Sequence, residues 1–128
     1  MSPSPVDFYI DFSSPYSYIA SEWIEALAAR HGGLPWDCVL SAELFRAYKP
    51  SPAVYRGAAD LLGIAPGELL MVAAHPSDLA AAQRAGLKTA YVERPLERGP
   101  GGAPENSAGQ RFDWVASDFI DLAAKLGA

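Results

Sequence analysis

Cysteine and histidine are scarce in this sequence. The single cysteine, Cys38, leaves no partner for an internal disulfide or for a redox-active thiol pair. Its neighbours Val39 and Leu40 are apolar, which favours a buried strand thiol over a reactive one. Cys38 and the two histidines, His31 and His75, lack the spacing of a zinc site. The sequence therefore predicts neither a zinc site nor a thiol-pair redox centre.

Basic charge and long apolar runs are also lacking. Ten Lys and Arg residues face fifteen Asp and Glu residues, which gives a net charge of −5. A phosphate-rich partner would require the opposite sign, so the charge argues against general nucleic-acid binding. No apolar run reaches the ~18 residues of a membrane span, and the first residues lack the basic and apolar regions of a signal peptide. We therefore expect a cytoplasmic protein without membrane or nucleic-acid partners, either a monomer or a homodimer.

The chain contains enough apolar residues for one real core. Half of its 128 residues are apolar and 20% are charged, which predicts a single domain over residues 1–128. The alternation of strands and helices predicts an α/β fold with three layers, in which helices cover both faces of a parallel sheet of four to five strands. Right-handed crossovers favour a flavodoxin-like or Rossmann-like strand order of 2-1-3-4, with a possible fifth strand at the edge. The expected strands are 6–12, 36–40, 69–73, 89–92 and 112–116, and the expected helices are 15–31, 52–62 and 78–85. Ser117 is expected to cap a final helix that reaches Leu126.

Polar residues gather where such a sheet binds ligands, at the carboxyl ends of its first and third strands. Asp11 ends the first strand, Asp78 follows the third, and Lys49 lies in the loop after the second. Ser13 and Ser14 add hydroxyls and backbone donors at a helix N-terminus, a position that favours anions. Two carboxylates, one ammonium and an anion cradle suit a carboxylate nucleophile balanced by a lysine, or a weak magnesium site.

Each of these residues also has a simpler interpretation. Asp11 could cap the turn between strand and helix, and Asp78 could be the first-turn acid of a helix, which the helix dipole favours. Lys49 precedes Pro50 and could be a solvated loop lysine. His75 could be structural or face solvent.

Several segments of the second and third quarters of the chain form a recognisable set. They are residues 34–37, 41–45, 48–50, 54–55, 71–75, 78–79, 85–90, 94–97 and 99–100, with 112–122 continuing the match. As a set they closely resemble the back half of haloacid dehalogenase-superfamily hydrolases, especially the type II 2-haloacid dehalogenases. The resemblance implies that Lys49 neutralises the charge of nucleophile and substrate, and that Asp78 holds the site together. His75 lies in a matched segment and joins Ser13 and Ser14 as a candidate substrate-binding residue.

The opening segment resembles a different family. Residues 11–18, Asp-Phe-Ser-Ser-Pro-Tyr-Ser-Tyr, are similar to the start of DsbA-class thioredoxin-like proteins, closest to 2-hydroxychromene-2-carboxylate isomerases and kappa-class glutathione transferases. In that family the serine before the proline, matched by Ser14, contacts or activates glutathione. The cis-proline loop of that family is not found, and the chain has no room for the helical cap of a dehalogenase. We interpret residues 1–31 as a thioredoxin-like strand and helix, and residues 32–128 as a dehalogenase-like back half.

Three hypotheses for the function follow. The favoured one is a chimeric or truncated scaffold, natural or engineered, with no or weak catalytic activity. The alternative is a minimal dehalogenase or phosphatase in which Asp11 attacks a small halo-acid or phosphoryl substrate and forms an ester that water cleaves. In it Lys49 balances charge, Asp78 orients Lys49 or a weakly bound magnesium ion, and Ser14 holds the carboxylate of the substrate. The third is a glutathione- or thiol-binding module that uses Ser14.

Overall fold

The computed structural model describes residues 40–97, 99–101 and 107–127. The chain divides into two compact units, one of which holds Ser4–Tyr48 and the other Lys49–Ala128 together with the first three residues. The described part of the first unit contains a short 3-10 helix, η1 (Ala42–Phe45). The predicted strands 6–12 and 36–40, the helix between them and the site residues Asp11, Ser13 and Ser14 lie outside the described residues.

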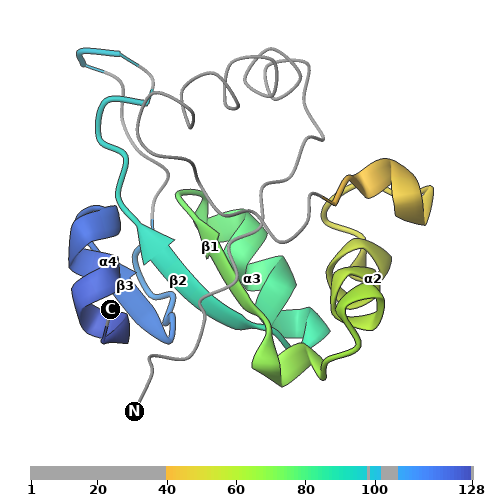
Figure 1. The fold of residues 1–128 in the computed structure, drawn as a ribbon. Helices are drawn as coiled ribbons and strands as arrows, with labels where there is room; N and C mark the ends of the chain where they lie inside the picture. The colour runs from red at the N-terminus through yellow and green to blue at the C-terminus, as the bar shows by residue number, and fades with distance from the viewer. Residues whose placement is uncertain (1–39, 98, 102–106, 128) are drawn as a thin grey trace, which may run out of the picture. The chain divides into compact units, whose positions relative to one another are not determined.

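The larger unit contains a parallel sheet of three described strands. They are β1 (Leu70–Ala73), β2 (Lys88–Val92) and β3 (Trp114–Ala116), in the order β1-β2-β3 (Figure 1). Leu70 pairs in register with Lys88, and Ala90 with Trp114. The three strands expected in this part of the chain are present, and their side-by-side order is confirmed. The last one begins two residues later than predicted.

Helices α3 (Pro76–Ala85) and α4 (Phe119–Leu126) cover opposite faces of this sheet. Ala90 and Val92 of β2 form a buried cluster with Ala116 and with Leu122 of α4. Side chains alternate between the two faces along a strand, so Thr89 and Tyr91 point to the other face. Gln83 of α3 donates to the Thr89 hydroxyl there at 2.9 Å. The expected arrangement of a parallel sheet between helices is therefore confirmed for the described residues.

Helix α2 (Pro52–Leu62) packs against α3 rather than directly on the sheet (Figure 1). Val54, Tyr55 and Ala59 are its buried residues. The apolar spacing of residues 54, 58, 61 and 62 predicts that Leu61 faces inward, but Leu61 is 58% exposed, so that prediction is wrong. Tyr55, which is 3% exposed, is part of the buried face instead. At the other end of the contact, Arg56 Nε donates to the Ala85 carbonyl at 3.2 Å.

Two helix starts differ from those expected. α3 begins at Pro76 instead of Asp78, because His75 takes the extended N-cap conformation and proline is well suited to the first helical position. α4 is capped by Asp118, whose side chain accepts from the Asp121 N–H, and not by Ser117. A carboxylate at the cap is also favoured by the helix dipole.

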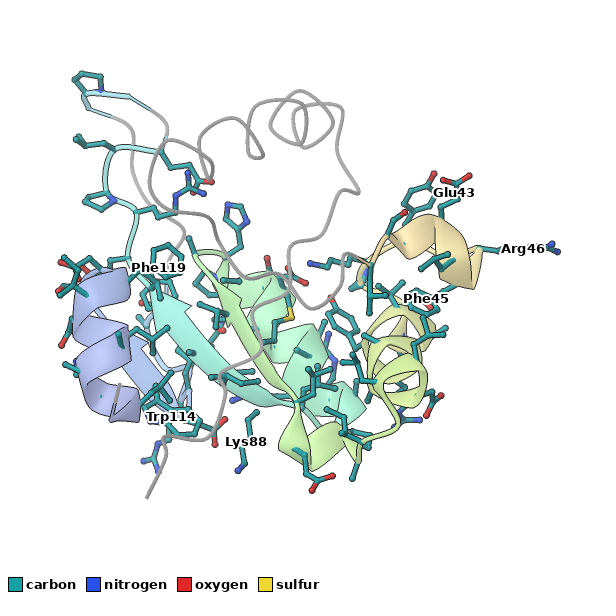
Figure 2. All side chains as sticks on the ribbon, viewed as in Figure 1. Glu43, Phe45, Arg46, Lys88, Trp114 and Phe119 are labelled. Carbon is teal, nitrogen blue, oxygen red and sulfur yellow. The ribbon has the colours of Figure 1, made fainter. Side chains whose placement is uncertain are left out.

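The amino and carboxyl ends of the parallel strands lie at opposite ends of the sheet and carry different residues. Lys88 and Trp114, which begin β2 and β3, lie at one end, and Phe119 lies towards the opposite end (Figure 2). At the amino end, the fully buried Thr89 is satisfied by Asp113, which accepts from the Thr89 N–H at 2.8 Å. The loops that follow β1 and β2 leave from the carboxyl end, where the candidate site residues occur. No helix in the described part of the chain is long and apolar enough to cross a membrane.

Candidate functional site

Asp78 is the centre of a polar cluster beside the carboxyl end of β1. Lys49 Nζ donates to its Oδ2 at 2.8 Å, and the Tyr55 hydroxyl donates to its Oδ1 at 2.5 Å. Each carboxylate oxygen therefore accepts one hydrogen bond from a different partner. The site prediction placed Lys49 and Asp78 in the same crevice, and the structure brings them into direct contact.

Local sequence explains how these three side chains meet. Asp78 is held in the first turn of α3, where Pro76 starts the helix two residues earlier. Tyr55 lies in the first turn of α2, and Lys49 precedes that helix in the chain. The cluster is therefore assembled by the packing of α2 against α3.

The cluster is partly shielded from water. The Lys49 and Asp78 side chains are 25% and 18% exposed, and Tyr55 is buried. Ion pairs at such sites are screened less by salt than exposed ones. Asp78 is also the first-turn acid of α3, a position at which the helix dipole stabilises an acidic residue. Lys49 is thus not an ordinary solvated loop lysine. Asp78 is both an acidic residue in the first turn of a helix and a member of the cluster.

His75 lies in a second polar group, at the start of the same helix. Its Nε2 is 3.2 Å from Glu97 Oε2, and Arg94 Nη1 is 3.5 Å from Glu97 Oε1. Glu97 and Arg94 belong to the loop that follows β2. The His75 side chain is 46% exposed, so His75 is not a core residue, and it makes no capping hydrogen bond although His75 occupies the N-cap position of α3.

The described residues of the cluster supply one carboxylate, that of Asp78, whereas the predicted magnesium site also used Asp11, which lies outside the described residues. Mg²⁺ is held by several oxygen ligands in octahedral geometry, whereas here one carboxylate faces an ammonium and a hydroxyl. Within residues 40–97, 99–101 and 107–127 no three His, Cys, Asp or Glu residues are placed to hold a metal ion.

Sequence reasoning missed Tyr55 as a site residue. Apolar periodicity predicts the helix from 52 to 62, but it does not indicate which group a buried hydroxyl of that helix reaches. Tyr55 lies beside the apolar Val54 in the first turn of that helix, which suggests that its ring is buried. A buried tyrosine hydroxyl usually has a hydrogen-bond partner, so the sequence could have indicated a polar contact at Tyr55.

We expect Tyr55→Phe to lower the free energy of unfolding by about 1–3 kcal/mol, because it removes a hydrogen bond to a charged, mostly buried carboxylate. The urea midpoint, followed by circular dichroism, measures the change. Tyr48→Phe is the matched control, since Tyr48 is 72% exposed. Equal midpoints for the parent and Tyr55→Phe would show that this bond contributes nothing to stability.

Sequence comparison places this cluster in a family. Residues 47–122, more than half of the chain, match the HAD-hydrolase-like family. The chain belongs to that family. The match includes Lys49, Tyr55, His75 and Asp78, so the whole described cluster lies within the family domain.

Individual relatives of this HAD-hydrolase-like chain are dehalogenases. It is 38% identical over 58 residues to (S)-2-haloacid dehalogenase 4A of Burkholderia cepacia, which covers 45% of this chain and 25% of that protein. The crystal structure of L-2-haloacid dehalogenase PA0810 superposes with a TM-score of 0.70 at 52% identity, over 77% of this chain and 42% of the other. That of the defluorinating L-2-haloacid dehalogenase Rha0230 gives 0.70 at 42% identity, over 78% and 41%. The chain thus spans less than half the length of each of these relatives.

These findings confirm the haloacid dehalogenase-like part of the sequence prediction, and with it a hydrolase fold of the α/β class. The thioredoxin-like opening was assigned to residues 1–31, which lie outside the described residues, and it stays a prediction together with the chimera.

Proposed function

We propose that this chain is a hydrolase of the haloacid dehalogenase type that acts on small 2-halocarboxylic acids. The observation that carries the proposal is the contact of Lys49 with Asp78, completed by Tyr55. An ammonium held by a carboxylate at the carboxyl end of a parallel strand is suited to a reaction in which two anions must approach each other. The dehalogenase relatives support the same choice of substrate class.

In the proposed reaction, the Asp11 carboxylate attacks the carbon that bears the halogen. A carbon–oxygen bond forms, the carbon–halogen bond breaks and halide leaves with the electron pair. Lys49 offsets the negative charges of nucleophile and substrate, while Asp78 and Tyr55 fix the position of Lys49. Ser13, Ser14 and His75 are proposed to contact the substrate carboxylate. Water then cleaves the ester and releases a 2-hydroxy acid.

Phosphate-ester hydrolysis is the second candidate within the same family. Phosphoryl transfer depends on cations that neutralise several phosphate oxygens, commonly Mg²⁺. A single ammonium is enough for a monoanionic halo-acid, and Lys49 supplies one in the described cluster. This difference favours the halo-acid, and we derive no step through a metal.

The proposal is tested by incubating the folded chain with 2-chloropropionate and measuring both chloride and 2-hydroxypropionate. We expect the two products in equal amounts, and no chloride above background from the heat-unfolded chain. Release of phosphate from a phosphate ester, without chloride, would favour the second candidate.

The nucleophile is tested with Asp11→Asn at equal folded concentration. An amide is a poor nucleophile, so chloride release should disappear. Full release by this variant would rule out Asp11. No release from either folded chain would instead support the hypothesis of a scaffold without activity.

A further inference from the structure

Strand β3 lies at one side of the described sheet. Among the described strands it pairs only with β2, in the order β1-β2-β3 (Figure 1). The N–H of Glu93, which directly follows β2, donates to the Ala116 carbonyl at 3.0 Å, so this carbonyl points towards β2. Backbone groups alternate in direction along a strand, so Val115 turns its N–H and its carbonyl to the outer side. The outer edge of β3 therefore has Val115 at its centre.

A side chain from α4 covers the outward carbonyl of Val115. Lys125 Nζ donates to this carbonyl at 2.7 Å and to Asp121 Oδ2, also at 2.7 Å. Lys125 lies in the last turn of α4, and its side chain is 45% exposed. An ammonium group is therefore held on the outer edge of β3, at the middle residue of the strand.

Asp121 keeps this ammonium in place. Its Oδ2 also accepts from the Ser117 N–H at 3.0 Å, and its own N–H donates to the side chain of Asp118, the N-cap residue of α4. The hydrogen bonds from the Lys125 side chain and from the Ser117 N–H hold the pKa of Asp121 below its usual range. Asp121 therefore remains a carboxylate at neutral pH and ties Lys125 to the start of its own helix.

Without the ammonium, the edge of β3 is complementary to itself. In an antiparallel pair of strands, two residues that face each other can exchange both of their backbone hydrogen bonds. A twofold axis beside Val115 would pair the N–H of each copy with the carbonyl of the other. The Val115 side chain is 50% exposed, on the face opposite to the one that Ala116 and Leu122 share, and would add apolar contact. With Lys125 in place, each carbonyl is occupied and two ammonium groups would meet in the interface.

We infer that the outer edge of β3 is a surface for pairing with a second copy of this chain, and that Lys125 keeps it closed. Open edge strands favour pairing with another chain, and lysines at the edge are a common means of preventing it. A second copy is the occupant because twofold pairing at Val115 needs only groups that this chain itself carries. The inference concerns association alone and does not depend on the proposed reaction.

The Lys125→Met variant of the full chain tests the inference. Methionine keeps much of the length of the side chain, but it has no charge and cannot donate to the Val115 carbonyl. We expect sedimentation equilibrium to give twice the mass found for the parent chain. We also expect the Val115 amide to exchange its hydrogen more slowly in this variant than in the parent, because pairing of the two copies protects it.

Two further variants separate the edge from charge. Lys88→Met removes the same charge from the beginning of β2 and should have the mass of the parent. Val115→Pro, added to Lys125→Met, should restore the mass of the parent because proline lacks the N–H that the twofold pairing uses. Proline is tolerated in an edge strand where the N–H faces outward. Circular dichroism of each variant shows whether it is folded.

Each result supports or overturns the inference. Association of Lys125→Met that Val115→Pro reverses, together with a protected Val115 amide, supports it. Equal masses for the parent and Lys125→Met would overturn it, and so would association that leaves the exchange of the Val115 amide unchanged. Association of the parent with a protected Val115 amide would also overturn it, because the edge would then be open with Lys125 present. If the variant with Val115→Pro does not fold, the exchange of the Val115 amide in Lys125→Met decides.

Discussion

Lys49→Met is expected to slow chloride release by about 10²–10³-fold, the loss that follows removal of one well-placed electrostatic group from a reaction centre. The reason is that the attacking carboxylate and the carboxylate of the substrate repel each other, and Lys49 is the cation held at the cluster by Asp78 at 2.8 Å. Methionine has a similar length and shape without the charge. Initial rates of chloride release, measured over a range of 2-chloropropionate concentrations, give the change in kcat/KM.

The matched control for this experiment is Lys88→Met. Lys88 begins β2 at the amino end of the sheet, away from the carboxyl end where the cluster lies (Figure 2). The Lys88→Met variant removes the same charge from the chain as Lys49→Met and should leave the rate of chloride release unchanged. A Lys49→Arg variant should retain part of the rate, because the charge remains although its geometry differs. Equal rates for Lys49→Met and Lys88→Met would show that Lys49 acts only through the net charge of the chain, or not at all.

Leu79→Ala is expected to lower the free energy of unfolding by about 2–5 kcal/mol. Leu79 is fully buried and is among the largest side chains enclosed in the described part of the molecule. It lies on α3, which contacts β1 and β2 on one side and α2 on the other. A cavity at this position removes packing from all three layers that bring the cluster together. A urea titration, with the slope compared between variants, measures the loss.

Leu61→Ala is the matched control, because the same atoms are removed from a side chain that is 58% exposed. Its effect should stay within about 0.5 kcal/mol. If Leu79→Ala and Leu61→Ala shifted the midpoint equally, α3 would not be the centre of the packing. Since Leu79 directly follows Asp78, the Leu79→Ala variant should also lose any activity at a lower temperature than the parent does.

The order of strands and helices was predictable over residues 49–127. There the apolar periodicity of each segment agrees with the glycine and proline residues that mark its ends. Gly63 and Gly86 each follow an apolar helical pattern and end a helix with a positive φ, as glycine at that position indicates. Boundaries were less predictable where two residues compete for one role. Asp118 rather than Ser117 caps α4, and both residue types are good caps, so the choice depends on which one the strand before it leaves in position.

The proximity of Lys49 and Asp78 was predictable from the sequence, whereas the contacts of Tyr55 and Glu97 were not. The carboxyl ends of parallel strands indicated where Asp78 and Lys49 would lie. Nothing in the local pattern indicated that Tyr55 or Glu97 would join them. Tyr55 reaches Asp78 through the packing of two helices, and Glu97 reaches His75 through a turn after β2. Contacts of this kind depend on tertiary distances, which neither residue periodicity nor capping rules contain.

Neighbouring residues of α2 bond to opposite ends of α3. The Tyr55 hydroxyl bonds to Asp78 in its first turn, and Arg56 Nε bonds to the carbonyl of Ala85, its last residue. Insertion or deletion of one residue between these two points would rotate one end of α3 by about 100° relative to the other and change its length by about 1.5 Å. The two bonds could not then form together. The number of residues in α3 is therefore as restricted as their identity, and natural length variation should accumulate elsewhere in the chain.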